Sequence, residues 1–259
     1  MYYSTMKITI TGDTHYGFSR HGNEANEKML ESIGKENPDI LIHTGDYGSV
    51  SLDEREAYWK KTREILGTSI LIIAVNGNHD YWDATHKVNS VMDITKINTR
   101  IFEKYSIYHP YTTIIINGIS IRGFDGWYFS DVRTNDPNYI PHYFPEGVKW
   151  LRDKSDKEFG SLLPLFKKDK ERGDTTILVT HFGFIANDDD WKSRESRVLG
   201  QKQYFGGNPK YENYLDDVDY LLYGHSHHEF EGVASNNKTK VINAGSDYEF
   251  PYYKILEIW

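Results

Sequence analysis

The feature that most constrains the fold of this chain is a series of short, β-branched apolar runs that each stop abruptly at polar residues. In chain order they are KITIT (7–11), ILIHT (40–44), ILIIAV (70–75), TTILVT (175–180) and YLLYG (220–224). Short, nearly continuous apolar runs bounded by turn residues are typical of strands that are buried on both faces. They predict a mainly parallel or mixed β-sheet.

Helical patterns separate the first three of these runs. In segment 23–37, Met29, Leu30 and Ile33 recur at helical spacing. Segment 52–67 opens with acidic residues and closes with a glycine, which is typical of a helix and its end. The order strand, helix, strand, helix, strand implies right-handed crossover connections and therefore an α/β fold.

The second half of the chain carries different signals. Asn117-Gly118 separates two apolar runs, which is the strongest short-range signal of a hairpin. Segment 227–259 is interpreted as about three antiparallel strands, and segment 133–154 as a surface loop that leads into a helix. We therefore expect two sheets packed face to face with helices outside, in a single domain that spans residues 1–259.

Composition excludes several classes of protein and site. Cysteine is absent, so disulfides, thiolate zinc sites and a cysteine nucleophile are excluded. No segment approaches the roughly 20 apolar residues of a membrane span, and the first ten residues lack the pattern of a secretion signal. We expect a cytoplasmic protein. The formal charge of −8 argues against long nucleic acid as a partner, because broad affinity for it depends on lysine and arginine.

Groups that can bind metals or transfer protons follow the apolar runs directly. They are Asp13, His15, Asp46, Asn78, His79, His181, His225 and His227. Because open α/β sheets bind ligands beyond the carboxyl ends of their strands, these side chains are expected to meet. Taken singly, such an aspartate is usually a helix cap or turn former, and such a histidine is usually a hydrogen-bonded, half-buried residue. A single metal site explains all of them together.

The types of ligand indicate which metals would fit. Carboxylate, imidazole and amide oxygen, without thiolate, suit Mn²⁺, Fe, Zn²⁺ or Co²⁺. The groups are too many for one tetrahedral ion. Two ions about 3.5–4 Å apart, bridged by a carboxylate, would use all of them.

The motifs GDTH, GD, GNHD, a single histidine after a strand, and GHSH occur here in that order. This ordered set resembles the calcineurin-like metallophosphoesterases, and it extends from Asp13 to His227. The segment VINAGS (241–246) also resembles the one that follows the last ligand pair in that family. The resemblance implies a four-layer αββα sandwich of two mixed sheets flanked by helices, and a dinuclear centre with Mn²⁺ as the first choice and Fe, Zn²⁺, Co²⁺ or Ni²⁺ as alternatives.

The resemblance also implies a role for each residue. One ion would be held by Asp13, His15, Asp46 and His227, and Asp46 would bridge to a second ion completed by Asn78, His181 and His225. Asn78 is in addition a candidate contact for the substrate. His79 would stay off the metals and face the substrate as the catalytic imidazole. Asp80 is expected to orient the His79 ring, with a helix-cap role as the alternative.

The implied activity is hydrolysis of a phosphodiester by a hydroxide that bridges the two ions, with His79 assisting. Serine/threonine phosphatases of this superfamily carry arginines near these motifs, whereas GDYGSVS and VNGNHD contain none. This departure argues against a protein phosphatase, and together with the net acidity it makes a small molecule or nucleotide the expected substrate. The alternatives are a phosphomonoesterase or protein phosphatase, a nuclease of the same superfamily, and a non-catalytic metal-binding module.

Two segments are expected to form the rim that sets specificity. Segment 122–136 offers Trp127, Tyr128 and Arg133, and segment 187–211 offers Trp191, Arg194 and Arg197 before Gly206-Gly207. Arginine suits bidentate binding of phosphate, and tryptophan suits stacking on a base. For each of these residues, an ordinary solvated charge or a packing ring is an equally good interpretation. The sequence leaves the oligomeric state open.

Overall fold

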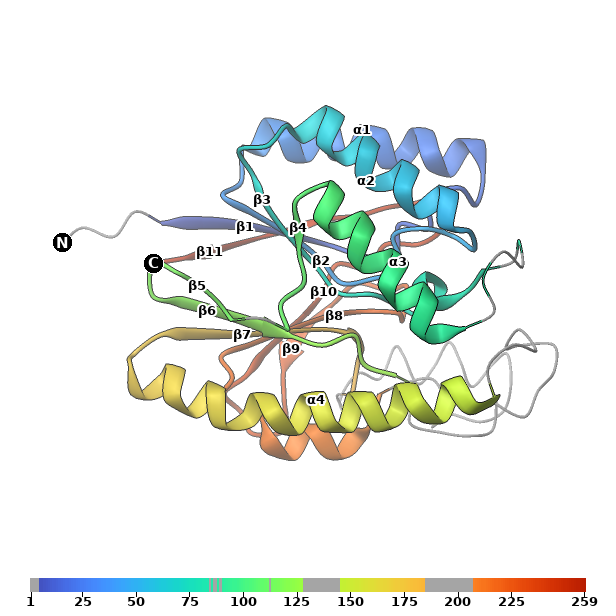
Figure 1. Ribbon diagram of the computed structural model, residues 1–259. Helices are drawn as coiled ribbons and strands as arrows, with labels where there is room; N and C mark the ends of the chain where they lie inside the picture. Colours follow the sequence, from blue (N-terminus) through green and yellow to red (C-terminus); the bar gives the residue numbers. More distant parts are fainter. Residues whose placement is uncertain are drawn as a thin grey trace.

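The computed structural model describes residues 5–83, 85, 88, 90–111, 113–127, 145–184 and 207–259. Its centre is a pair of mixed β-sheets that face each other, with helices on both outer sides (Figure 1). The expected four-layer αββα sandwich is thereby confirmed.

The first sheet has the strand order β11-β1-β2-β3-β4. Its strands are β1 (Met6–Thr11), β2 (Ile40–His43), β3 (Leu71–Ala74), β4 (Ile107–Tyr108) and β11 (Lys254–Ile258). The pairs from β1 to β4 are parallel, and β11 joins β1 in antiparallel orientation. The parallel strands therefore all end at one edge of the sandwich.

The second sheet has the strand order β5-β6-β7-β8-β10-β9. Its strands are β5 (Ile114–Ile116), β6 (Ile119–Gly123), β7 (Thr175–Phe182), β8 (Tyr220–Gly224), β9 (Phe230–Val233) and β10 (Lys240–Asn243). The hairpin expected at Asn117-Gly118 joins β5 to β6, and both of its central residues have positive φ. The middle strands β6, β7, β8 and β10 run parallel, and β9 pairs with β10 in antiparallel orientation.

The C-terminal segment differs from its prediction of about three antiparallel strands. β9 and β10 are antiparallel, but β10 continues into a parallel pair with β8. β11 leaves this sheet altogether and pairs with β1 of the other one. The prediction was wrong in pairing, because β10 also pairs with the earlier strand β8 and β11 pairs with β1 near the start of the sequence.

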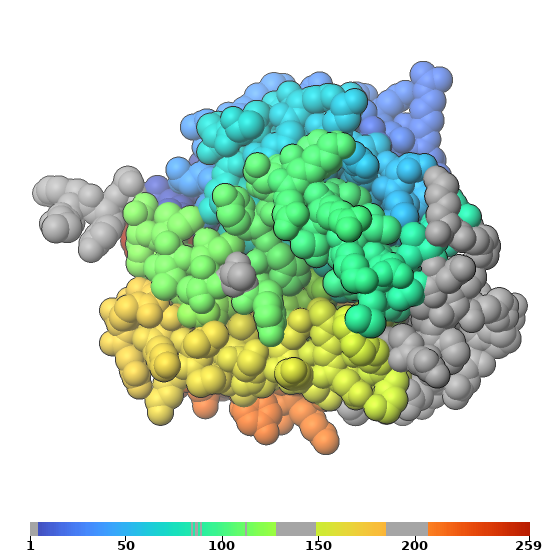
Figure 2. Space-filling view, viewed as in Figure 1, coloured from blue at the N-terminus to red at the C-terminus, as the bar shows by residue number. Residues whose placement is uncertain are grey.

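The helices form the two outer layers. α1 (Arg20–Glu36), α2 (Leu52–Leu66) and α3 (Val91–Lys104) cover the first sheet, and α4 (Pro145–Glu171) covers the second (Figure 1). Figure 2 shows the same layers as the upper and lower parts of the molecular surface. Two short 3₁₀ helices, η1 (His79–Tyr81) and η2 (Pro209–Tyr214), complete the described elements.

Three apolar clusters explain why the strands read as continuous hydrophobic runs. Ile10 and Ile42 of the first sheet pack with Val179 of the second sheet between the sheets. Alternate residues such as Leu41 point outward into the cluster beneath α1 to α3. Leu178 does the same beneath α4. Both faces of each central strand are therefore buried, as the sequence predicted.

Local sequence sets the helix ends. Ser51 and Glu54 form a reciprocal capping box at the start of α2: the Ser51 hydroxyl accepts from the Glu54 N–H and the Glu54 carboxylate accepts from the Ser51 N–H. Such a cap stabilises a helix by about 1 kcal/mol. Asn37 ends α1 in the left-handed conformation. These local contacts set where α1 ends and where α2 begins.

Candidate metal centre

The candidate ligands lie at the edge of the sandwich where the parallel strands end. Asp13 and His15 follow β1, Asp46 follows β2, and Asn78 follows β3. His181 lies near the end of β7, and His225 and His227 follow β8. Loops of the first sheet thus meet loops of the second, as expected for ligand sites in parallel sheets.

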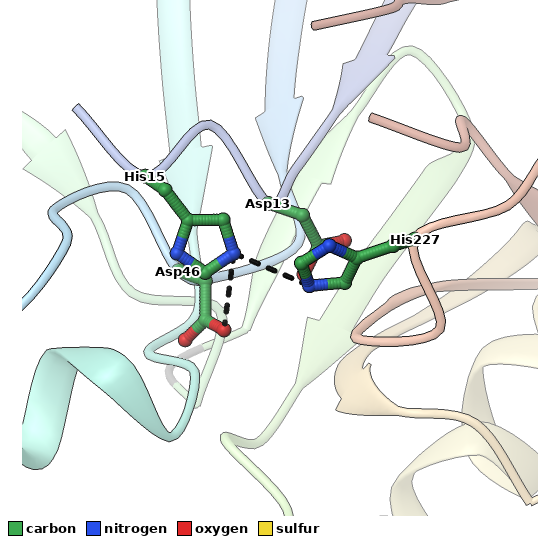
Figure 3. A group of neighbouring side chains, drawn as sticks. All are labelled: Asp13, His15, Asp46 and His227. Carbon is green, nitrogen blue, oxygen red and sulfur yellow. Dashed lines mark hydrogen bonds and ion pairs between the residues drawn. The ribbon is translucent and has the colours of Figure 1, made fainter. Parts of the chain in front are cut away.

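The first group comprises Asp13, His15, Asp46 and His227, whose donor atoms all lie within 4.8 Å of one another. The Nε2 atoms of His15 and His227 are 3.2 Å apart, and His15 Nε2 lies 3.8 Å from Asp46 Oδ2 (Figure 3). His227 Nε2 lies 3.8 Å from Asp13 Oδ1. Figure 3 shows the four side chains converging from three separate loops.

The second group comprises Asp46, His181 and His225, again within 4.8 Å. His181 Nε2 lies 3.3 Å from Asp46 Oδ2 and 3.1 Å from Asn78 Oδ1. Asp46 belongs to both groups, so its carboxylate is the link between them. The family resemblance implied the same two sets, with Asn78 added to the second.

These residues fit a pair of divalent ions. Asp46 Oδ2 is buried and forms no hydrogen bond with any described residue. Two ligand atoms that share one ion at about 2.1 Å lie roughly 3.0–3.4 Å apart. The separation of 3.2 Å between His15 and His227 and that of 3.3 Å between His181 and Asp46 fall in this range. Nitrogen and oxygen donors without sulfur suit Mn²⁺, Fe, Zn²⁺, Co²⁺ or Ni²⁺.

The backbone of the ligand loops is unusual. Asp13, His15, Asp46, His225 and His227 have φ angles of 49°, 40°, 55°, 70° and 53°. Residues other than glycine rarely adopt this left-handed conformation, which costs about 1–3 kcal/mol each and is concentrated at functional sites. The surrounding chain holds them there: the Asp13 N–H donates to Gly45 O (2.9 Å) and the His15 N–H donates to Asp46 O (3.0 Å).

Two glycines of the motifs are required by close approach of the loops. A Cβ atom at Gly77 would lie 2.1 Å from Asp46 Oδ1. A Cβ atom at Gly45 would lie 2.7 Å from the Gly77 nitrogen, and Gly45 also has a φ of +101°. The glycines of GD and GNHD therefore allow the β2 and β3 loops to touch.

His79 lies beside the cluster but belongs to neither ligand group. Its N–H donates to Asp46 Oδ1 at 2.8 Å, and its ring lies 4.5 Å from the His15 ring between centroids. Its Nδ1 lies 2.8 Å from the Ser49 carbonyl oxygen. Because a carbonyl can only accept, Nδ1 carries the proton in this contact and Nε2 is the nitrogen left for chemistry. Burial lowers the pKa of His79.

The expectation that Asp80 orients the His79 ring was wrong. Asp80 is fully buried, and its Oδ2 accepts from the N–H of Asp46 (2.7 Å) and of Gly77 (2.8 Å). It caps no helix through its side chain either, since η1 begins one residue before it. Asp80 instead joins the two metal-binding loops. Burial, followed by the charge of Asp46, raises its pKa to about 8.

The structure adds supporting contacts that the sequence did not reveal. Asp247 Oδ1 lies 3.1 Å from His227 Nδ1, and the Thr44 carbonyl oxygen lies 2.8 Å from His181 Nδ1. The N–H of His225 donates to both oxygens of Asp13 at 2.9 Å. Such partners fix the tautomer and orientation of metal ligands. The position of Asp247 directly after VINAGS was the one available signal.

Burial and neighbouring charges shift the pKa values of the clustered side chains in different directions. Burial raises the pKa of Asp13 to about 6. Burial also opposes ionisation of Asp46, but the neighbouring His181 and His79 outweigh it and hold the pKa of Asp46 well below its usual range. For His181, burial is outweighed by the Asp46 charge, and the pKa rises to about 9. The site thus favours positive charge next to Asp46.

The expected specificity rim lies mostly outside the described residues. Tyr128, Arg133, Trp191, Arg194, Arg197 and Gly206 all fall there. Trp127 is described and is only 5% exposed. It packs against Tyr81 and Phe182, so its expected role in stacking on a substrate was wrong. In the part of the chain that is described, no helix has the length and apolar character needed to cross a membrane.

Comparison with known proteins gives one match to a family. A family model for calcineurin-like phosphoesterases matches residues 6–229. None of the curated proteins compared with the chain matches it.

Solved structures share the fold at low sequence identity. The NAD nucleotidase NadN of Haemophilus influenzae has a TM-score of 0.51 and 15% identity, covering 98% of this chain and 49% of NadN. A dimetal phosphatase from Danio rerio has a TM-score of 0.57 and 12% identity, and the match covers 95% of this chain and 88% of the phosphatase. GAP50, the anchor in the inner membrane complex of Plasmodium, has a TM-score of 0.53 and 14% identity, and the match covers 98% of this chain and 81% of GAP50. The chain therefore spans about half the length of NadN.

Proposed function

The chain belongs to the calcineurin-like phosphoesterase family, and from this premise we propose that it is a metal-dependent phosphoesterase that hydrolyses a phosphodiester in a small molecule or nucleotide. The observation that carries the proposal is the pair of ligand groups that share Asp46. A module with a purely structural ion would need one group. Two groups joined by a carboxylate are the arrangement that phosphoryl-transfer chemistry uses.

We assign the ligands as the geometry groups them. Asp13, His15, Asp46 and His227 would hold one ion, and Asp46, His181, His225 and Asn78 the other. When bound, two divalent ions polarise a phosphoryl oxygen and lower the pKa of a coordinated water. The substrate phosphate would therefore bind at the end of the sandwich, with Asn78 at its border.

His79 is the proposed catalytic imidazole. The Ser49 carbonyl holds its Nδ1–H, so the ring has a fixed orientation, and Nε2 remains as the proton-transferring atom. A protonated Nε2 would donate to the oxygen of the leaving group. Help of this type is worth roughly 10²–10⁴-fold in rate.

The nearby arginine does not serve the substrate. Arg55 of α2 is fully buried, and its guanidinium donates to the backbone oxygen of His79 (3.0 Å) and to Asn98 Oδ1 (3.3 Å). A phosphomonoester carries more negative charge than a diester and gains more from a bidentate arginine. As far as the described residues go, the use of Arg55 inside the fold favours the diester. The net charge of −8 favours a small substrate over long nucleic acid.

A direct test compares bis-p-nitrophenyl phosphate with p-nitrophenyl phosphate on the same preparation. The protein is stripped with a chelator and reloaded with Mn²⁺, Fe²⁺, Zn²⁺, Co²⁺ or Ni²⁺ in parallel. Metal-dependent hydrolysis of the diester supports the proposal. Hydrolysis of the monoester alone would assign a phosphatase instead, and hydrolysis of neither with any metal would leave a metal-binding module.

A further inference from the structure

The Tyr248 ring lies against the imidazoles of the candidate metal centre. Its centroid is 4.2 Å from that of His15, with the two planes nearly parallel at 19°. It is 5.0 Å from the His227 ring and 6.2 Å from the His79 ring. Tyr248 thus borders both the first ion site and the proposed catalytic imidazole.

Phe18 extends this aromatic surface outward. Its ring centroid lies 4.6 Å from that of Tyr248, and 53% of the residue is exposed. It follows His15 in the loop after β1, so the same loop carries a metal ligand and the outer ring. Covering the exposed Phe18 ring with a ligand would be favourable, because removal of apolar surface from water lowers the free energy.

The Tyr248 ring is held by the same turn that supports a metal ligand. Asp247, which contacts His227 Nδ1, also accepts from the Tyr248 N–H at 2.9 Å. The N–H of Asp247 and the oxygen of Phe250 bond across this turn at 3.1 Å. The position of the Tyr248 ring is therefore coupled to the position of the ion site.

We propose that Phe18 and Tyr248 form an aromatic platform that binds a planar ring of the substrate, specifically a nucleobase attached through its sugar to the phosphate. The inference rests on the proposed phosphoesterase function and specifies its substrate as a nucleotide. Because Tyr248 borders His15, His227 and His79, the organic group of a phosphate bound at the ions would be within reach of these rings. Stacking a base on an aromatic side chain tolerates any base, so the platform would select nucleotides without selecting among them.

The test measures binding of two phosphonates that differ only in the base. They are the O-methyl esters of the methylene-phosphonate analogues of adenosine 5′-monophosphate and of methyl riboside 5-phosphate, which carry one negative charge as a phosphodiester does and whose C–P bond resists hydrolysis. Calorimetry on the metal-loaded protein should give a dissociation constant at least about 5-fold lower for the adenosine compound, the smallest effect expected of one stacked base. Phe18→Leu, which keeps apolar bulk but removes the ring, should abolish that difference, and Phe18→Trp should retain it.

Tyr214→Leu provides the control, because Tyr214 is similarly exposed (57%) but lies in η2. This variant should bind both compounds as the wild type does. Equal affinity for the two compounds in the wild type, or a preference that survives Phe18→Leu, would overturn the platform while leaving diester hydrolysis intact. If neither compound binds, the phosphate site itself is wrong, and the platform is overturned with it.

Discussion

Two buried carboxylates of this fold are held in opposite ways. Asp169 of α4 is fully buried and accepts from Ser120 Oγ (2.6 Å), Arg122 Nε (2.6 Å) and Arg172 Nη2 (2.6 Å). Asp46 is also buried, and its Oδ1 accepts from the His79 N–H (2.8 Å). Its Oδ2 accepts no hydrogen bond from the described residues.

The difference teaches how to distinguish a structural acid from a site that awaits a cation. Asp169 has its counter-charge built in, and its hydrogen bonds from Arg122 outweigh burial and lower its pKa. Asp46 has imidazoles around it and a left-handed backbone at φ 55°. Burying a carboxylate without a cation is costly, and the open oxygen of Asp46 is where a bound metal ion would supply positive charge.

Asp46→Asn should produce the largest effect, because it removes the ligand that both groups share. We expect loss of both ions and a fall in diester hydrolysis greater than the 10–100-fold that loss of a mere supporting partner causes. Emission spectroscopy after dialysis against Mn²⁺ measures the metal content.

The comparison of the two carboxylates also predicts how chelation should affect the stability of the Asp46→Asn variant. Chelation should lower the melting temperature of the wild type, since a ligand that binds only the folded state stabilises it. It should leave the melting temperature of the variant unchanged. Full metal occupancy in the variant would contradict the role of Asp46 as a bridge.

His79→Ala should leave the metal content unchanged and reduce turnover by about 10²–10⁴-fold, because it removes proton transfer but no ligand. Metal analysis and kcat on the diester are measured on one preparation. His21→Ala on the exposed face of α1 is the matched control and should behave as the wild type. Loss of metal from His79→Ala would make His79 a ligand and would refute the assignment.

Asp169→Asn should show the opposite pattern from Asp46→Asn. Metal content and activity of the folded protein should be unchanged, while the free energy of unfolding should fall by about 3–5 kcal/mol, because a buried Arg122 is left unpaired. Urea unfolding followed by circular dichroism measures the change. A variant as stable as the wild type would show that this ion pair contributes nothing.

The pH dependence of that loss follows from the lowered pKa of Asp169. Its stabilisation is present above the ordinary value of 3.8 and is lost as the pH falls through the lower value in the folded state. The gap in unfolding free energy between wild type and Asp169→Asn should therefore be constant near neutral pH and narrow only below pH 3.8.

Asp247→Asn should have the smallest effect of the series, since it weakens a contact behind one ligand. We expect about 10–100-fold weaker binding of one ion, with the other retained. Metal titration followed by calorimetry separates the two. Asp216→Asn, an exposed acid elsewhere on the second half of the chain, serves as the control and should change neither. Equal weakening of both ions would contradict the two-group arrangement.

The sequence predicted much of this site because its signals are local. A strand buried on both faces must read as an apolar run, as Ile40 to Ile42 do, and the residue after it must leave the sheet. Asp13, Asp46 and His225 each follow such a run, so they were expected to meet beyond the strand ends. Those positions depend only on where strands end.

The features that the sequence did not predict depend on the paths of loops and on long-range packing. Asp80 was expected on the His79 ring, but the left-handed backbone at Asp46 brings the Asp46 N–H to Asp80 instead. The sequence alone could not tell whether the Trp127 ring stacks on a substrate or packs in the core. The ring is buried because residues of α4 and β7 pack around it. The pairing of β11 with β1 joins the two ends of the chain and has no local signal.

Each ligand group contains residues from both sheets. In the first group, His227 follows a strand of the second sheet. In the second group, Asp46 follows a strand of the first sheet. An ion bound there would link the two sheets at this edge of the sandwich. Loss of metal would then lower the stability of this edge as well as the proposed activity. In the metal-free protein this edge should open first, and proteases should cleave the loops after β1 and β8 before any other part of the two sheets.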